Sequence, residues 1–283
     1  MRSRAGRGRD VTSRGTVAVV QPFERLRYLA RWSDEDDGAL VSEAADCLAG
    51  FADDPAGLVV ACRRLLSHHP ASGALWWLCS RVLTAPEPAE AAWEAWTLIN
   101  EDRTATRLSG LLPFPHDDPI AVLGWPDLAG AALAERPDLD VIAVRRRSGD
   151  DQLRARLARR EHPVRVVNEV ELAALEPSYL LVEATAASPT CAVVPDGAAD
   201  LLGDLAGGGT TGWLVAGVGR LLPERLFASL QRELERDDPD HVPVALVDAG
   251  RFARVAGPRG LDAPGELSRR VDAPVAPELL RLS

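Results

Sequence analysis

The segment from Tyr179 to Pro223 constrains the fold more than any other part of the chain. Two short apolar runs, Leu180–Val182 and Trp213–Val218, flank a helix-like segment at Ala198–Ala206. Apolar runs of this length are typical of buried strands, and strand–helix–strand units build parallel sheets. Ligands of such sheets bind at the carboxyl ends of the strands. The segment therefore predicts an α/β fold and the edge at which a ligand site would lie.

Further apolar runs alternate with helical segments on both sides of this unit. Strands are predicted at Ile120–Leu123, Val141–Val144, Val164–Val167, Val244–Asp248 and Phe252–Val255. Helices are predicted at Leu128–Ala134, Asp150–Arg160, Val170–Leu175 and Pro223–Glu235. Alternation of this kind is typical of a doubly wound parallel sheet. Residues 113–283 are therefore predicted to form a Rossmann-like α/β domain.

The preceding part of the chain has a helical period. Apolar residues recur at helical spacing from Leu40 to Phe51, and a fourth helical segment runs from Pro88 to Ile99. Asp54 and Ser72 are suitable N-cap residues for two helices in between. Residues 34–112 are predicted to be a helical domain, and residues 1–33 a disordered or poorly defined tail. Four tryptophans at helical spacing are predicted to pack inside the helical domain: Trp76, Trp77, Trp93 and Trp96.

The charge distribution limits the partners. The chain carries a net charge of −10, although its first 14 residues are rich in arginine. An acidic body argues against a specific nucleic-acid-binding face. No run of about 18 apolar residues exists, so we expect no membrane span, and the arginine-rich start does not read as a secretory signal.

The absence of lysine excludes several chemistries. Every basic side chain other than histidine is an arginine. A P-loop, a protein kinase and a pyridoxal-phosphate enzyme each require a lysine. The four cysteines, Cys47, Cys62, Cys79 and Cys191, form no CxxC pair. We expect reduced, buried thiols in a cytoplasmic protein, and no metal site.

One glycine-rich stretch imitates a dinucleotide-binding motif. Gly207–Gly212 fits the GxGxxG pattern. Such a fingerprint must follow a strand and open a helix, whereas this stretch follows a helix and enters a strand. We interpret it as a helix stop and a turn, and we predict no nicotinamide or other cofactor.

The order of these elements, together with three short segments, resembles a known family. The closing segment Val271–Leu280 reads Val-Asp-Ala-Pro-Val-Ala-Pro-Glu-Leu-Leu, and Glu161–Val167 is followed by Tyr179–Ala187. This arrangement is similar to the family of the translation initiation factor 2B α/β/δ subunits and methylthioribose-1-phosphate isomerase, over roughly residues 35–282. The resemblance implies a homodimer formed through the sheet domain.

The resemblance also implies where catalytic groups would be, and they are missing. The family's isomerases carry a cysteine and an aspartate at positions that correspond to Gly124 and Thr185 here. The phosphate-binding segment corresponds to Val194–Ala198, which has no lysine. Isomerisation requires groups that exchange a proton near pH 7, which glycine and threonine cannot do. We therefore predict no catalytic residues and lean against an enzyme.

A ligand site is still predicted at the carboxyl edge of the sheet. Arginine suits phosphate, and glycine lets backbone approach a ligand. The predicted anion anchors are Arg145, Arg146, Arg147 and Arg220, with Glu183 as a polar contact and close backbone approach at Gly124, Gly217 and Gly219. Alternatively, the arginine run is a solvated strand end that pairs with Asp150 and Asp151.

Three functions remain open at this point. The first is a non-catalytic or strongly diverged protein that binds a phosphorylated sugar or nucleotide, or acts as a regulatory or assembly subunit. The second is a sugar-phosphate (aldose–ketose) isomerase that uses other groups, with Glu183, Asp127, Cys191 and Asp196 as candidates. The third is a pure assembly partner whose crevice is filled by side chains, for example Trp125.

Overall fold

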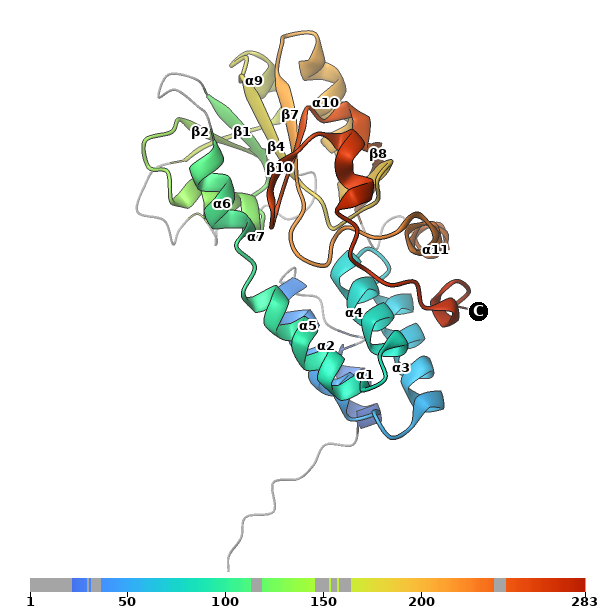
Figure 1. The fold of residues 1–283 in the computed structure, drawn as a ribbon. Helices are drawn as coiled ribbons and strands as arrows, with labels where there is room; N and C mark the ends of the chain where they lie inside the picture. The colour runs from blue at the N-terminus through green and yellow to red at the C-terminus, as the bar shows by residue number, and fades with distance from the viewer. Residues whose placement is uncertain are drawn as a thin grey trace, which may run out of the picture.

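The computed structural model describes residues 22–29, 31, 37–112, 119–145, 153, 157, 164–236 and 243–282. A helical region at the N-terminus is followed by a mostly parallel sheet flanked by helices, as the sequence predicts. Figure 1 shows the helical region below the sheet, with the chain returning between them near the C-terminus. No helix in these ranges is long and apolar enough to cross a membrane.

In the part of the N-terminal region that the structure describes there are five helices: α1 (Pro22–Leu29), α2 (Asp37–Ala49), α3 (Pro55–His68), α4 (Gly73–Thr84) and α5 (Pro88–Asn100). The predicted caps are present, because the side chains of Asp54 and Ser72 accept hydrogen bonds from the N–H groups of Gly57 and Leu75. Helix α1 corrects the interpretation of residues 1–33 as tail only. Its Leu26 and Leu29 are buried in the bundle core, a tertiary contact that the mixed local sequence does not reveal.

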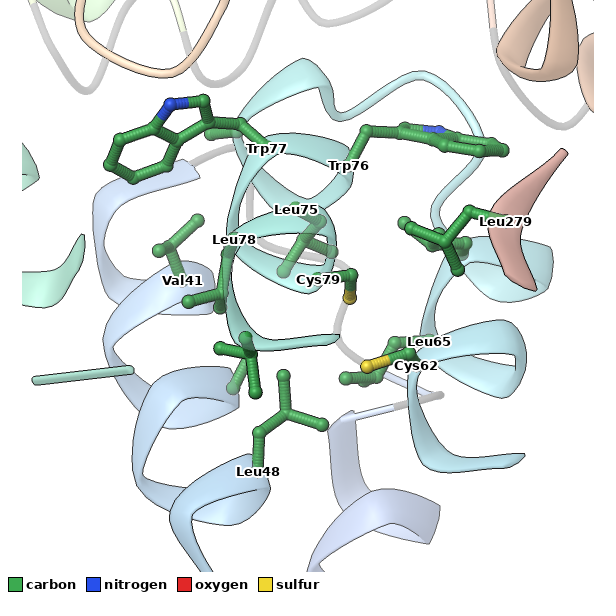
Figure 2. Close-up of a cluster of buried hydrophobic side chains, with 14 of the residues drawn as sticks. Val41, Leu48, Cys62, Leu65, Leu75, Trp76, Trp77, Leu78, Cys79 and Leu279 are labelled. Carbon is green, nitrogen blue, oxygen red and sulfur yellow. The ribbon is translucent and has the colours of Figure 1, made fainter. Parts of the chain in front are cut away.

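The core of the bundle is built around α4, whose side chains are buried on all sides. Figure 2 shows Trp76 and Trp77 at one end of α4, and Leu48 of α2 and Leu65 of α3 further along the core. Both tryptophans are fully buried, as predicted, since large aromatic rings supply much apolar area. The prediction was wrong for Trp93 and Trp96, which are 47% and 36% exposed. Their rings stand edge to face on α5, and the Nε1–H of Trp96 donates to the hydroxyl of Ser42 in α2 at 2.6 Å.

The main sheet has seven strands in the order β10-β9-β7-β4-β1-β2-β3. Its strands are β1 (Ile120–Leu123), β2 (Val141–Val144), β3 (Arg165–Val167), β4 (Tyr179–Glu183), β7 (Thr211–Val215), β9 (Arg254–Gly257) and β10 (Gly260–Asp262). All neighbours pair in parallel except β9 and β10, which form an antiparallel hairpin at one edge. The unit β4–α10–β7 confirms the strand–helix–strand prediction, because β4 and β7 are parallel neighbours.

Helices cover both faces of this sheet. Helices α6 (Thr104–Leu111) and α7 (Asp127–Ala134) pack on one face, and α9 (Glu169–Ala173) and α10 (Ala198–Ala206) on the other (Figure 1). Helix α11 (Glu224–Leu234) packs instead against the bundle. The glycine run ends α10 and enters β7, as interpreted. Of the helix predicted at Asp150–Arg160, only residues 153 and 157 lie within the described ranges; both are helical.

A second, small antiparallel sheet was not predicted. It has the order β5-β6-β8 and consists of β5 (Ala186–Ala187), β6 (Cys191–Pro195) and β8 (Val244–Asp248). The run at Val244–Asp248 is therefore a strand, as predicted, but it belongs to this sheet and not to the parallel one. Local apolar pattern identifies a strand, whereas its partners depend on the path of the whole chain.

Two sets of contacts fix the bundle against the sheet. The N–H of Gly73 at the start of α4 donates to the carbonyl of Thr185, at 3.0 Å. The C-terminal segment, which includes the 3₁₀ turn η3 (Pro277–Leu279), returns to the bundle. There the hydroxyl of Ser80 donates to the carbonyl of Pro274 at 2.5 Å and accepts from the N–H of Ala276 at 3.0 Å. The closing segment is thus part of the bundle core.

Candidate functional site

The strand order reverses between β1 and β4. From β1 the chain moves to β2 and β3 on one side, and β4 then returns to the other side of β1. Ligands of open α/β sheets bind where the strand order reverses in this way, at the carboxyl ends of the strands. Gly124 follows β1 at this point, and Glu183 ends β4. Helix α7 begins three residues after Gly124, so its free N–H groups face the same place, which we call the switch-point crevice.

The carboxylate of Glu183 occupies the helix N-terminus in this crevice. Its Oε2 atom accepts hydrogen bonds from the N–H groups of Leu128 and Ala129, both at 2.9 Å. These are the first-turn donors of α7 that have no partner inside the helix. The side chain of Glu183 is 5% exposed. A negative group at a helix N-terminus is favourable because the helix dipole places partial positive charge there.

Arg220 completes the partners of this carboxylate. Its Nη1 atom lies 2.6 Å from Oε1 of Glu183 and 2.8 Å from the carbonyl oxygen of Ala184, and its side chain is 10% exposed. The structure therefore brings two of the predicted ligand residues together, Glu183 and Arg220, as partners of each other. A buried ion pair with supporting hydrogen bonds satisfies both charges without a ligand.

A second carboxylate closes the neighbouring part of the crevice. Oδ2 of Asp102, from the α5–α6 junction, accepts the N–H of Val218 at 2.8 Å. A Cβ at Gly217 would lie 2.5 Å from this oxygen and 2.5 Å from Cδ1 of Leu128. Gly217 is thus required for close approach, as predicted for a glycine here, but the approaching atoms are those of Asp102 and Leu128.

The two positions that correspond to catalytic residues carry no titratable group. Gly124 has a φ of +70°, a conformation that side-chain-bearing residues rarely adopt. Both backbone groups of Thr185 are hydrogen-bonded: its N–H donates to the carbonyl of Val193 at 3.0 Å, and its carbonyl accepts from the N–H of Gly73. Neither residue can exchange a proton near pH 7.

The arginine run lies elsewhere on the sheet. Arg145 follows β2 and is exposed, and its N–H donates to the carbonyl of Val167 at 2.9 Å. Strand β2 is separated from β4 by β1, so Arg145 and the Glu183–Arg220 pair stand at different strand ends. Arg146 and Arg147 lie outside the described residues, as do Asp150 and Asp151.

The candidates for an alternative isomerase site come from different elements, and of them Asp127 starts the helix whose N–H groups Glu183 binds. Asp127 is exposed at the start of α7, and Asp196 follows β6 of the small sheet. Cys191 starts β6, where burial raises the pKa of its thiol. A protonated thiol is a weak nucleophile at neutral pH. Trp125 is half-buried and packs over α7, where a Cβ at Gly130 would lie 2.5 Å from its Nε1 atom. Among the described residues no cluster of His, Cys, Asp or Glu could hold a metal ion.

An open pocket does exist at the same sheet edge, at the carboxyl ends of β7 and β9. Its volume is about 60 Å³, and we call it the β7/β9 pocket. Two predicted residues, Gly217 and Gly219, line it, and Gly219 has a φ of +76°. The charged lining was not predicted from the sequence: Arg259, Asp262, Arg270 and Asp272. The sequence pattern that could have pointed to this region is the run Gly257-Pro258-Arg259-Gly260, which is typical of a turn between two strands.

Comparison with solved structures identifies the fold. The translation initiation factor eIF-2B of Pyrococcus horikoshii OT3 aligns with a TM-score of 0.69 at 12% identity, over 86% of this chain and 97% of that one. A chain of the tetrameric eIF2B-beta2-delta2 complex from Chaetomium thermophilum aligns with a TM-score of 0.66 at 14% identity, over 88% and 92%. The 5-methylthioribose 1-phosphate isomerase of P. horikoshii OT3 gives 0.59 at 13% identity, over 88% and 86%.

The chain has the fold of these proteins. The resemblance inferred from the order of elements and the closing segment is therefore confirmed at the level of the eIF2B-like fold. The sequence itself matches no protein-family model and no curated protein. At identities this low the eIF2B-like fold carries no activity with it, and function has to be argued from the site.

Proposed function

We propose that this protein is a non-catalytic regulatory or assembly protein with an eIF2B-like fold. The observation that supports this most directly is the position of the Glu183 carboxylate. It accepts hydrogen bonds from two N–H groups of α7 and pairs with Arg220. The donors that would bind the anionic group of a ligand therefore already bind a carboxylate of the protein itself. The crevice is thereby a structural element of the sheet domain.

Two features of the crevice argue against the isomerase alternative. Gly124 and Thr185 stand where the resemblance puts catalytic residues, and Glu183 is held by three hydrogen bonds and 5% exposed. A general base must reach a substrate proton within hydrogen-bond distance. With both its oxygens engaged inside the protein, Glu183 is a poor base for an external substrate.

Assembly is supported by the kind of protein that shares this fold. One comparison structure is a tetramer of eIF2B beta and delta subunits. We propose that this chain likewise associates through its sheet domain, as a homodimer. The rival proposal is that the switch-point crevice binds a phosphorylated sugar or nucleotide, with Arg145, Arg146, Arg147 and Arg220 as anchors.

Thermal unfolding with a ligand panel separates these proposals. The panel contains ribose phosphates, methylthioribose-1-phosphate, and nucleoside mono- and diphosphates. A ligand at about 100 times its dissociation constant adds about 2.7 kcal/mol to the free energy of unfolding, which shifts Tm by several degrees. We expect no shift with any member, and a dimer by light scattering. A shift that is lost in an Arg220→Gln variant would favour the ligand proposal, and a monomer at micromolar concentration would contradict assembly.

A further inference from the structure

The β7/β9 pocket combines an apolar interior with charged groups of both signs. Its apolar lining comes from three separate segments and includes Leu221, Val255, Pro258 and Leu267. Asp262 and Arg270 neutralise each other, since Nη2 and Nε of Arg270 lie 2.6 and 3.0 Å from Oδ1 of Asp262. The pocket therefore has an ion pair built into one wall.

Two further charges line the pocket and are not neutralised by any residue that the structure describes. Arg259 comes from the β9–β10 turn, and Asp272 from the segment that follows the 3₁₀ helix η2 (Pro264–Arg269). Both residues are exposed. Across the described part of the chain, neither side chain makes an ion pair or hydrogen bond. One cation and one anion are thus presented to whatever enters.

We propose that this pocket binds a free α-amino acid with a small branched apolar side chain. The carboxylate of the ligand pairs with Arg259, its ammonium group pairs with Asp272, and its side chain enters the apolar interior. A volume of about 60 Å³ is room for about four to six water-sized groups. This matches the three or four carbon atoms of a valine or leucine side chain.

The charge balance selects a zwitterion over the phosphorylated ligands considered for the switch-point crevice. The four charged residues of the pocket, two arginines and two aspartates, sum to zero. A phosphate that approached Arg259 would also meet the carboxylate of Asp272, and like charges at short range repel. A zwitterion is attracted by both. The proposal does not depend on the function proposed above, because its charged residues are not those of the switch-point crevice.

The test uses the full chain and ligands that differ by one group. Thermal unfolding and calorimetry are carried out with L-valine, with 3-methylbutanoate, which lacks the ammonium group, with isobutylamine, which lacks the carboxylate, and with glycine, which lacks the side chain. We expect L-valine to raise Tm and the three analogues to bind about tenfold or more weakly, because each loses a charge-assisted or apolar contact. Equal binding of L-valine and 3-methylbutanoate, or no binding of L-valine or L-leucine at millimolar concentration, would overturn the proposal.

Variants then locate the site. Arg259→Gln and Asp272→Asn should each weaken L-valine binding about tenfold or more, and both are surface changes that leave the fold intact. The matched controls are Arg269→Gln and Glu266→Gln, whose side chains are 82% and 55% exposed and lie outside the pocket lining. The controls should bind as the parent protein does. Binding that survives in both pocket variants would place the amino acid elsewhere.

Discussion

Two places at the same edge of the sheet use charge in opposite ways. In the switch-point crevice, the charged side chains already form hydrogen bonds within the protein, and they belong to Glu183, Arg220 and Asp102. In the β7/β9 pocket, Arg259 and Asp272 are exposed and unpaired within the described residues. The topology marks the first place as the ligand site, yet only the second presents free charges. Position in the fold alone is therefore insufficient to identify a ligand site. It is also necessary to know whether the polar groups there are already bound within the protein.

The largest expected effect comes from breaking the pair in the crevice. Glu183→Ala leaves the guanidinium of Arg220 buried without its partner, together with two unpaired N–H groups of α7. Loss of one member of a buried pair costs about 3–5 kcal/mol in the free energy of unfolding. Urea denaturation of the parent and the variant measures this difference.

The control for that variant is an exposed pair. Arg27 and Glu24 are 2.6 Å apart, with side chains 63% and 59% exposed. Arg27→Ala should change the free energy of unfolding by less than about 1 kcal/mol. A Glu183→Ala effect no larger than that of Arg27→Ala would show that the crevice pair is solvated and available to ligands.

A smaller effect is expected from filling the space at Gly217. Gly217→Ala introduces a Cβ into contacts of 2.5 Å with Asp102 and Leu128, and overpacking of this kind costs about 1–3 kcal/mol. Gly110→Ala, in α6, is the control, since nothing lies within 4 Å of its Cβ position. That change should stabilise the helix by about 0.5–1 kcal/mol. Both are measured by thermal unfolding, and a neutral Gly217→Ala would mean that the crevice is roomier than described.

The reactivity of Cys191 tests whether this residue could act as a catalytic nucleophile. Burial raises the pKa of this thiol, so its thiolate is scarcer than that of free cysteine at pH 7.5. Ellman's reagent should therefore modify the native protein more slowly than free cysteine, with the rate rising as the pH approaches the raised pKa. Cys191→Ser supplies the background from the three buried cysteines. Modification as fast as that of free cysteine or faster would restore Cys191 as a nucleophile.

The smallest effect is expected at the β7/β9 pocket itself. Without ligand, Arg259→Gln and Asp272→Asn should each alter the free energy of unfolding by no more than about 0.5 kcal/mol, because neither side chain has a partner among the described residues. Urea denaturation in amino-acid-free buffer provides the measurement. Destabilisation as large as that of Glu183→Ala would show that the charges of the pocket, like those of the crevice, are paired within the protein.

Much of the fold was predictable because it is encoded locally. The caps at Asp54 and Ser72 and the apolar runs of β1, β2 and β4 depend on a few adjacent residues. The small sheet was not predictable, since β5, β6 and β8 pair across distant parts of the chain. Trp93 and Trp96 were misplaced for the same reason: helical spacing says that residues share a face, and only packing says which face is covered.

The candidate site was predictable only in part. The sequence indicated Glu183, Arg220, Gly217 and Gly219 as neighbours at one sheet edge. It could not indicate that Glu183 and Arg220 bind each other. A carboxylate and a guanidinium are equally suited to contact a ligand and to form an ion pair with each other. Arg259 and Asp272 were missed because they come to line one pocket only through the β9–β10 hairpin and the path of the C-terminal segment.

The most direct test of the closed crevice is chemical rescue with acetate. Acetate replaces the carboxylate that Glu183→Ala removes, and it can accept the same N–H groups of α7 and pair with Arg220. We expect acetate to raise the Tm of Glu183→Ala by about 2–4 °C for each kcal/mol that it restores to the free energy of unfolding. The reference is the same concentration of sodium chloride, and the Tm of the parent protein should be the same in both salts. Equal stabilisation of the parent protein by acetate would contradict the account, because its anion site would then be open.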